Sequence, residues 1–544
     1  MTDATALPSV MALGTYGPAV NEALERLDRD GTIPRVWAGD YTLWNRRPAE
    51  ITDRLGWLNV TGKMRMHLDE LREFAAGVRA DGIEQVVLLG MGGSSLGPEV
   101  LRAVLGTNEG APRMSVLDST VPEQVHAVDA GLDPTKTLFL LSSKSGATIE
   151  PLSLYRHYRA LVEGAVGPER AGGHFVAVTD PHTPLVELAA ESGFRKVFEA
   201  QADIGGRYSV LSHFGLVPAA LLGLPLDRLL DRASVMAGLC GPGEARKNPG
   251  AWLGAFLAAG VPEGRDKLTL LTSPALEPLG LWVEQLIAES TGKGGTGIVP
   301  VTGEPLLEPD AYGTDRLFVY LRLEGDANSP LDVAAERIAA LEHPVVRLDL
   351  KDRYDLTAEF FRWEIATAIA GALLGVQPFD QPEVQAAKDA AGRALRASQH
   401  QPWSDDPEPG PDLGALLTDV PRGAYLAVLA YTARTPGVDS ALAALRKNVG
   451  VKHHLATTVG YGPRYLHSTG QMHKGGPDSG RFLVLIVDVG QDIEVPGERF
   501  TLGELARAQA LGDVDALRRA GRRVGYANLG VDAEAGLLRL LAAL

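Results

Sequence analysis

The sequence predicts an α/β fold made of two doubly wound parallel-sheet lobes, followed by an appended carboxyl-terminal α/β segment. Runs of aliphatic residues, such as VVLL at 86–89, are typical of strands buried on both faces of a parallel sheet. These runs alternate with helical patterns, which is the order that parallel strands with covering helices require. The alternation starts afresh twice along the chain, which indicates more than one sheet.

The first lobe is expected to follow a mostly helical amino-terminal segment. In that segment, residues 16–28 have helical periodicity, residues 51–58 are expected to form a short helix, and residues 63–80 show a long amphipathic pattern. The pattern then predicts strands at 84–89, 113–117, 137–141 and 174–178, with helices at 98–105, 122–130 and 148–164.

The second lobe and the carboxyl-terminal segment repeat this alternation. The predicted elements are strands at 267–271, 316–321 and 345–348, a long helix at 355–374, strands at 425–431, 454–458 and 482–488, and helices at 438–448 and 502–520, the last of which ends the fold. Residues 399–412 are rich in proline and aspartate, which indicates a linker. We therefore predict an amino-terminal helical segment, a first lobe, a second lobe and a carboxyl-terminal segment that resembles a partial third copy of the same plan, at residues 1–62, 63–240, 241–398 and 413–544.

Composition restricts the classes of partner. The 544 residues carry a formal net charge of −16 at pH 7, so a nucleic acid or an anionic membrane surface would be repelled, and neither partner is expected. The amino terminus lacks a basic and apolar signal sequence, and no apolar run is long enough to span a bilayer, so a cytoplasmic location is expected. The single cysteine, Cys240, excludes an internal disulfide and a cysteine-rich zinc site.

A glycine-rich turn follows the strand expected at 84–89. The sequence GMGGSS places Gly90, Gly92 and Gly93 ahead of two serines, and Pro98 begins a helical pattern. Glycines allow backbone N–H groups to approach a ligand, and the following helix points its positive end at the same place. The spacing matches neither a dinucleotide fingerprint nor a nucleoside-triphosphate loop. The turn therefore predicts either an anion site, most simply for phosphate, or close backbone packing.

A second strand end carries hydroxyl groups. In LLSSKSGATIE (residues 140–150), four hydroxyl side chains surround Lys144 and a flexible glycine at a helix start, namely those of Ser142, Ser143, Ser145 and Thr148. One such hydroxyl is a common helix cap. Four of them with a lysine, beside the glycine-rich turn, favour a phosphate site.

Four motifs follow one another along the chain: GMGGSSLGP followed by SSKSGAT, then ADIGGRYS at 202–209, QLIAESTGK at 285–293 and FDQPEVQAAK at 379–388. In their residues and their order, these motifs resemble those of phosphoglucose isomerases. The resemblance spans about residues 85–390 and is nearest to the isomerase module that follows a transaldolase in some bacterial fusion proteins. It implies an aldose–ketose isomerase that interconverts glucose 6-phosphate and fructose 6-phosphate through an enediol or enediolate intermediate.

The resemblance also implies roles for matching residues. Glu289 matches the base that moves a proton between C1 and C2, a task that suits a carboxylate; Glu284 on the same helix is a rival. Arg207 matches the guanidinium that stabilises the enediolate, and its other interpretation is a salt bridge between lobes. Lys388 matches a group that assists ring opening, and its other interpretation is an exposed lysine. The implied substrate contacts are Gly93, Ser94, Ser143, Lys144, Ser145, Thr148, Gln285 and Gln381.

The sequence departs from the family pattern at three places. In the arginine block, His213 stands where the family usually has a small residue. In the lysine motif, Glu383 and Gln385 stand where the family has Gly and Glu. The ring-opening histidine is absent from its usual place shortly after the glutamate, because residues 304–320 contain none. LHSTGQ at 466–471, beyond the lysine motif, closely resembles the family's histidine motif. We therefore expect His467 to take this role, with the carboxyl-terminal segment folded over the site.

Other interpretations of the histidines stay open. His453, His454 and His473 are rivals of His467, and all four are also compatible with histidines that satisfy backbone carbonyls in loops. Their spacing fits no standard set of metal ligands, so no metal is expected.

No cofactor is expected, because proton transfer at an acidified carbon needs only a base and charge stabilisation. The expected partner is a small sugar phosphate. A homodimer is left open, since the histidine comes from the neighbouring subunit in dimeric relatives. Two alternatives remain: a dual phosphoglucose and phosphomannose isomerase, and a non-catalytic phosphosugar-binding regulator, which need not keep Glu289, Arg207 and Lys388 together.

Overall fold

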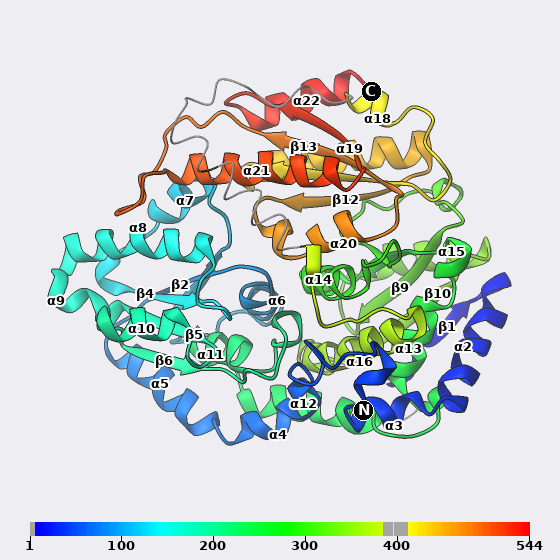
Figure 1. Ribbon diagram of the computed structural model, residues 1–544, viewed down its shortest axis with the longest axis horizontal. Helices are drawn as coiled ribbons and strands as arrows, with labels where there is room; N and C mark the ends of the chain where they lie inside the picture. Colours follow the sequence, from blue (N-terminus) through cyan, green and yellow to red (C-terminus); the bar gives the residue numbers. More distant parts are fainter. Residues whose placement is uncertain (1–5, 384–394, 396–411) are drawn as a thin grey trace.

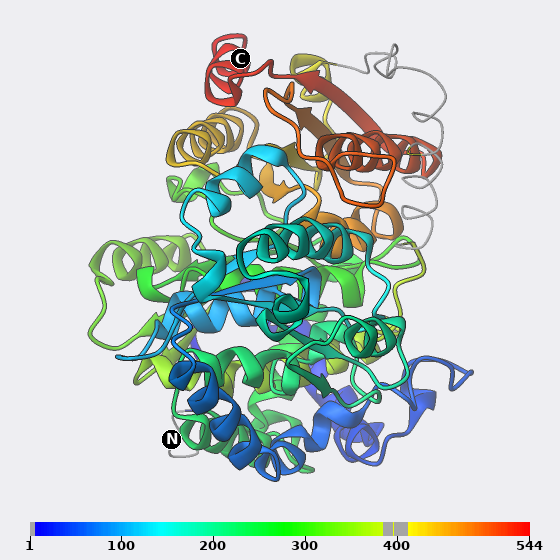
Figure 2. The same cartoon turned by 90° about the vertical axis from the view of Figure 1, so that its left-hand side faces the viewer.

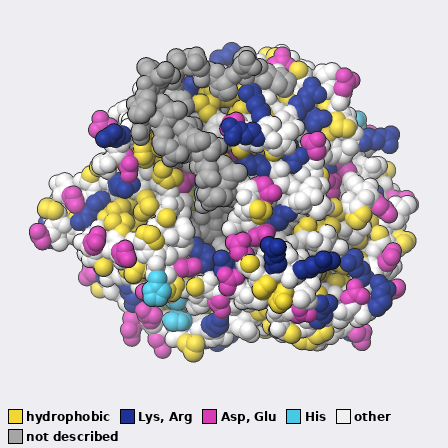
Figure 3. Space-filling model, in the orientation of Figure 1, with side chains coloured by type: hydrophobic (Ala, Val, Ile, Leu, Met, Phe, Trp, Pro, Cys, Tyr) yellow, Lys and Arg dark blue, Asp and Glu magenta, His cyan; other side chains and the backbone are white. Residues whose placement is uncertain are grey.

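The computed structural model describes residues 6–383, 395 and 412–544, which form three sheets covered by helices (Figure 1). The first sheet lies at the left of Figure 1, the second at the right, and the third, coloured orange to red, across the top. Figure 2 shows the third unit, residues 412–544, above the rest from the side as well. Over the face seen in Figure 3, acidic and basic side chains are interspersed. Among the described residues, no helix combines the length and apolarity that a membrane span needs.

The three sheets share one strand order. In spatial order, the first is β3 (Arg113–Leu117), β2 (Gln85–Gly90), β4 (Thr137–Ser142), β5 (Phe175–Thr179) and β6 (Lys196–Glu199). The second is β1 (Ser9–Ala12), β10 (Val345–Leu350), β9 (Arg316–Leu323), β7 (Lys267–Thr272) and β8 (Val299–Val301). The third is β12 (Ala456–Tyr461), β11 (Tyr425–Tyr431), β13 (Gly480–Ile486) and β14 (Arg523–Asn528). Of these described strands, only β1, which comes from the amino-terminal segment, pairs antiparallel.

This order confirms the doubly wound plan and its recurrence in the carboxyl-terminal segment. In each sheet, the first parallel strand of the chain has the second on one side and the third on the other. Ligands of such sheets bind at the carboxyl ends of the two strands that flank this reversal. In the first sheet these strands are β2 and β4, which lead into the glycine-rich turn and the hydroxyl-rich loop.

The helices pack on the faces of the sheets. Around the first sheet they are α5 (Leu68–Ala80), α6 (Leu96–Leu105), α7 (Pro122–Asp129), α8 (Ile149–Val166), α9 (Pro168–Ala171), α10 (Pro184–Glu191) and α11 (His213–Leu221). Those of the amino-terminal segment and second lobe are α2 (Gly17–Arg29), α3 (Thr32–Trp37), α4 (Val60–Arg65), α13 (Pro249–Ala258), α14 (Leu279–Thr291), α15 (Ser329–Ala340) and α16 (Leu356–Leu374), and α12 (Leu226–Leu239) packs on α16. Those of the third unit are α18 (Leu413–Leu416), α19 (Pro436–His453), α20 (Gly470–Gly475), α21 (Leu502–Arg519) and α22 (Ala533–Ala542).

Three expectations about elements were wrong. The helix expected over 63–80 is divided into α4 and α5, and a 3₁₀ turn, η3 (Gly56–Asn59), replaces the helix expected at 51–58. The chain does not end its fold at α21, because β14 and α22 follow. β14 is an edge strand with exposed ends, so it lacks the apolar run that marks the central strands. The linker expected at 399–412 lies outside the described residues, apart from Asp412.

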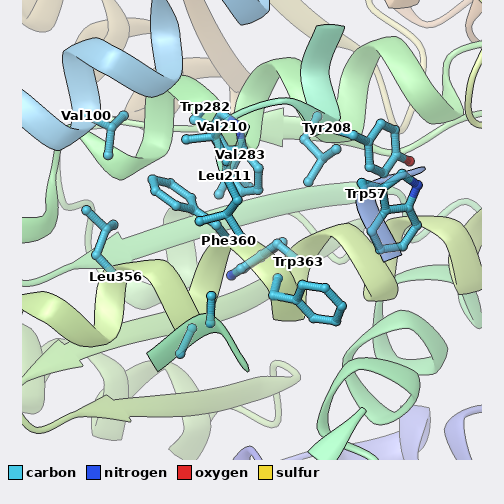
Figure 4. Packing of buried hydrophobic residues seen from close by; sticks show 14 of the residues in the cluster. Trp57, Val100, Tyr208, Val210, Leu211, Trp282, Val283, Leu356, Phe360 and Trp363 are labelled. Atoms are coloured by element: carbon cyan, nitrogen blue, oxygen red, sulfur yellow. The ribbon is translucent and has the colours of Figure 1, made fainter. Parts of the chain in front are cut away.

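One apolar core joins the loop after β6 to helix α14. Trp57 stacks on Tyr208 with ring centroids 5.2 Å apart, and Leu211 belongs to the same buried cluster as Trp282 and Val283 of α14 (Figure 4). Close packing of this kind leaves little freedom for either element to move alone. The residues beside Tyr208 and those on α14 are therefore held in fixed relation.

Candidate active site

Glu289 and Arg207 form a buried ion pair. Glu289 lies on α14, and Arg207 lies on the 3₁₀ turn η7 (Gly206–Tyr208). Arg207 Nη1 is 3.2 Å from Glu289 Oε1, and the side chains are 3% and 10% exposed. The pair therefore places a carboxylate directly beside a fixed guanidinium group.

Arg207 is locked in place by its other N–H groups. They donate to Ser290 Oγ at 2.8 Å, Gln381 Oε1 at 2.9 Å, and the carbonyls of Pro378 and Asp380 at 2.7 and 2.8 Å. Because these groups are already engaged, the guanidinium can stabilise a developing anion mainly through its charge. The same bonds bring Gln381 of the FDQP motif to the site.

Gln285 links the ion pair to the third unit. It lies one turn before Glu289 on α14, and its Nε2 donates to Glu289 Oε2 at 3.1 Å. The same nitrogen donates to the backbone carbonyl of His467 at 2.8 Å. Predicted residues from two distant parts of the chain therefore meet at one point.

His467 is bonded to a buried carboxylate that sequence reasoning missed. His467 lies at the end of η13 (Arg464–His467), and its Nε2 is 2.7 Å from Oε1 of Glu150. Burial raises the pKa of Glu150, but His467 and Gln509 outweigh burial and hold this pKa below its usual value. The only available signal was its position at the end of SSKSGATIE, in the first turn of α8.

The glycines of the first motif make room for protein backbone. A Cβ on Gly92 would lie 2.7 Å from the carbonyl oxygen of His467, and a Cβ on Gly93 would lie 2.0 Å from that of Gly206. Gly92 also has a φ of +53°, which suits glycine. Because neither glycine has a side chain, the segments that carry His467 and Arg207 can pack closely against the turn after β2.

The hydroxyl-rich loop lies at the amino end of α8. Ser143 Oγ is 3.0 Å from Thr148 Oγ1, and Ser145 Oγ is 3.5 Å from the same atom. Thr148 is the N-cap residue of this 18-residue helix, but its side chain makes no capping bond. The first N–H groups of α8 and three hydroxyls therefore share one place, where a helix favours an anion. Glu150, the partner of His467, follows two residues later.

The other phosphate candidates differ in surroundings. Lys144 Nζ pairs with the carboxylate of Asp180, so its charge is already matched. Ser94 is buried in the 3₁₀ turn η4 (Gly92–Ser94) after β2. Lys388, the fourth predicted catalytic residue, lies outside the described residues.

Lys293 is a further buried cation for which the sequence predicted no role of its own. It ends the QLIAESTGK motif, donates to the carbonyl of Gln377, and lies 2.7 Å from the carboxylate of Asp380. Burial and the nearby Arg207 lower the pKa of Lys293 to about 8. Lys293 therefore ties the end of α14 to the segment that holds Arg207.

The rival base, Glu284, faces away from this cluster. It borders a cavity of about 590 Å³ between α14, α19 and η13, and accepts a hydrogen bond from Thr302 Oγ1 at 3.1 Å. Burial raises its pKa to about 7. That pKa suits a base, yet the contacts with Arg207 and Gln285 belong to Glu289.

The rival histidines lie in other surroundings. Nδ1 of His454 is 3.1 Å from the backbone carbonyl of Ala311, and His453 is exposed at the end of α19. His473 is buried beside Phe482, and burial lowers its pKa well below the usual value. Across the ranges that the structure describes, no group of three or more His, Cys, Asp or Glu side chains is arranged to hold a metal ion.

Glu383, which departs from the family motif, makes hydrogen bonds to the third unit. The backbone N–H of Glu383 donates to Gln471 Oε1 at 3.0 Å, and the amide nitrogen of Gln471 bonds to the Glu383 carboxylate. The same nitrogen donates to the carbonyl of Gly292 at 3.0 Å. Gln471 belongs to LHSTGQ, so the departure at position 383 and the displaced histidine motif are in direct contact.

Comparisons with known proteins identify the family of the chain. The family model described as phosphoglucose isomerase matches residues 55–296. The chain is 30% identical over 382 residues to the glucose-6-phosphate isomerase of Symbiobacterium thermophilum, covering 61% of this chain and 85% of that one. It is 28% identical over 386 residues to the glucose-6-phosphate isomerase of Rubrobacter xylanophilus, covering 60% and 86%.

Solved structures share the fold. A hypothetical protein from Thermus thermophilus superposes with a TM-score of 0.61 at 27% identity, over 72% of this chain and 100% of that one. A glucose-6-phosphate isomerase from Chlamydia trachomatis superposes with a TM-score of 0.53 at 20% identity, over 69% and 79%.

Proposed function

The chain belongs to the phosphoglucose isomerase family, and on this premise we propose that it interconverts glucose 6-phosphate and fructose 6-phosphate. The observation that supports this best is the 3.2 Å contact between Glu289 and Arg207, joined through Gln285 to His467. Moving a carbonyl between C1 and C2 needs a base, a nearby positive charge and a group that opens the sugar ring. These three functions have candidate side chains within one hydrogen-bonded cluster.

The substrate phosphate binds at the carboxyl ends of β2 and β4. The first turn of α8 and the hydroxyls of Ser94, Ser143, Ser145 and Thr148 supply donors there, with the backbone N–H groups of Gly93 and Lys144. Because the Lys144 side chain is paired with Asp180, its backbone is the part that serves the phosphate.

His467 opens the ring with help from Lys388. Glu150 is held as an acceptor, so the His467 Nε2 carries the proton between them and Nδ1 faces the substrate. Lys388 gives a proton to the ring oxygen and Nδ1 of His467 takes the proton of the hemiacetal or hemiketal hydroxyl, so the ring C–O bond breaks and the carbonyl forms. The part of Lys388 rests on its motif alone.

Glu289 then performs the isomerisation. It takes the proton from C2 of the open aldose and returns it to C1, while the proton of the C2 hydroxyl passes to O1. Negative charge builds on the enediolate between these steps, and Arg207 lowers its energy through the field of a fixed guanidinium. Gln285 bonds to Glu289 and Gln381 bonds to Arg207, so the two glutamines keep these groups in position. Both glutamines also contact the substrate.

The test is a coupled assay of glucose 6-phosphate formation from fructose 6-phosphate, repeated with a chelator. We expect turnover in both conditions. Glu289→Gln is expected to bind substrate and to lose turnover. A protein that binds both sugars and converts neither would instead be a phosphosugar-binding regulator.

Finer points of the proposal have their own tests. Turnover of mannose 6-phosphate would identify a dual isomerase, which depends on space around C2. We place the reaction in the cytoplasm, which cell fractionation can check. We also propose that the chain is divided into the domains 1–62, 63–240, 241–398 and 413–544, which limited proteolysis can check. Homodimer formation is measured by light scattering; one chain already carries both Glu289 and His467 at the site.

A further inference from the structure

A chain of buried hydrogen bonds connects His467 to helix α21 of the third unit. The His467 Nε2 lies 2.7 Å from Oε1 of Glu150, and the same oxygen accepts a hydrogen bond from Gln509 Nε2 at 2.6 Å. Gln509 is 4% exposed and Glu150 is 2% exposed. Solvent therefore cannot readily replace either bond.

Thr120 fixes which way the Gln509 amide points. The fully buried Thr120 Oγ1 donates to Gln509 Oε1 at 3.4 Å. Because a hydroxyl donor faces the amide oxygen, the amide NH₂ group faces Glu150. An ionised carboxylate only accepts hydrogen bonds, so both Gln509 and His467 act as donors to it.

We infer that Gln509 is a positioning residue for ring opening, which keeps Glu150 as an ionised acceptor and so holds the His467 imidazole in one orientation. The inference rests on the proposed role of His467. Gln509 acts through Glu150 rather than on the substrate. The effect is general: groups that bond the partner of a catalytic imidazole fix its tautomer and its direction.

The same face of α21 holds the backbone that carries His467. Asp513, one turn after Gln509, accepts a hydrogen bond from Tyr465 Oη at 2.8 Å and pairs with Lys474 Nζ at 2.5 Å. Tyr465 lies in η13, two residues before His467. Helix α21 therefore fixes the histidine twice, through its backbone segment and through the partner of its ring.

The test compares two substrates in the ketose-to-aldose direction, followed by NMR. Fructose 6-phosphate must open its ring, whereas 5-deoxyfructose 6-phosphate lacks the ring-forming O5 and stays open. Gln509→Glu places a second carboxyl group next to that of Glu150. Either one of the two carboxyl groups is then protonated, or the two carboxylates repel each other. We expect kcat for fructose 6-phosphate to fall about 100-fold and that for the open substrate to stay within about threefold.

Two further variants keep the test decisive. Gln509→Leu removes the donor without adding charge, and we expect about a 10-fold fall on fructose 6-phosphate alone. Asp515→Asn, on the exposed face of α21 where Asp515 pairs with Arg519, is the matched control and should behave as wild type. Equal losses on both substrates, or no loss on either, would overturn the inference. A wild-type protein inactive on both substrates would contradict the proposed function instead.

Discussion

The two lobes and the third unit share a strand order but build the site in different ways. The lobes supply the ion pair of Glu289 and Arg207 and the strand-end loops after β2 and β4. The third unit supplies His467 together with the helix that supports it. The proposed base therefore comes from the lobes and the proposed ring-opening histidine from the third unit, and Gln285 is a direct link between them.

The third unit is docked by charged and polar contacts rather than by apolar packing alone. Arg464 makes two bonds to Asp118 of the first lobe, at 2.7 and 2.9 Å. Arg446 donates to the carbonyls of Thr302 and Gly303 in the second lobe, at 2.9 and 2.7 Å. Directional bonds of this kind fix orientation as well as proximity. The segment that carries His467 is thus held against both lobes.

The largest effect is expected from Glu289→Gln, which removes the base and keeps the shape. The loss of a general base costs about 10²- to 10⁴-fold in kcat, and the fall should be equal for fructose 6-phosphate and for 5-deoxyfructose 6-phosphate, because both need the proton transfer. Steady-state kinetics measure this, and binding measured by calorimetry serves as the control. A variant that kept wild-type turnover would remove Glu289 from the mechanism.

His467→Ala is expected to separate the two halves of the site. Turnover of fructose 6-phosphate should fall about 100-fold, while the open-chain analogue should be converted at nearly the wild-type rate, since Glu289 and Arg207 are untouched. His454→Ala is the matched control, because His454 lies against Ala311 on another surface. A His467→Ala enzyme that opened the ring at the wild-type rate would transfer the role elsewhere.

Arg464→Met is expected to loosen the docking of the third unit. It leaves the Asp118 carboxylate, 5% exposed, without its bidentate partner, so we expect a loss of about 2 kcal/mol in the free energy of unfolding. Urea denaturation measures this. Arg434→Met breaks an exposed pair with Asp439 and should cost at most about 0.5 kcal/mol. Equal stability of the two variants would argue that the Arg464–Asp118 pair does not hold the third unit in place.

Glu284→Gln distinguishes the two carboxylates of α14. The pKa of Glu284 is raised by burial from 4.5 to about 7, so its neutral form favours the fold. That stabilisation is complete below pH 4.5 and is lost as the pH rises through 7. We expect the variant and wild type to match at pH 4 and the variant to be more stable at pH 8, on the order of 3 kcal/mol. Its turnover should stay within about threefold, far from the cost of removing a base; a large fall would favour Glu284 as the base.

Much of the lobes was predictable because their signals are local. Buried parallel strands appear as aliphatic runs, and β3 and β11 have the bounds expected from the sequence. The GGR and ESTGK motifs directed attention to Arg207 and Glu289, whose contact the structure then showed. The edge strand β14 was missed because it has no such run.

Contacts across the chain were harder to predict. Glu150 and Gln509 are 359 positions apart, and no periodicity relates them. For the glycines of the first motif, the sequence left two interpretations open, room for a ligand or close backbone packing, and two of these glycines make room for the backbones of His467 and Gly206. A sequence indicates that space is needed at a glycine, but it does not say what fills that space.

The last prediction concerns whether His467 acts within its own chain. Its ring bonds to Glu150 and its carbonyl to Gln285 of the same chain, so each polypeptide should hold a complete site. Mixing His467→Ala with Glu289→Gln should then restore no activity on fructose 6-phosphate, even after denaturation and refolding together, because no assembly of the two contains one site with both groups. If the histidine were exchanged between copies, about a quarter or more of the wild-type activity would return in such a mixture, by simple statistics of pairing. The refolded wild type is the control for recovery, and light scattering reports whether mixed assemblies formed. Activity regained in the mixture would show that the third unit reaches over a neighbour's site rather than its own.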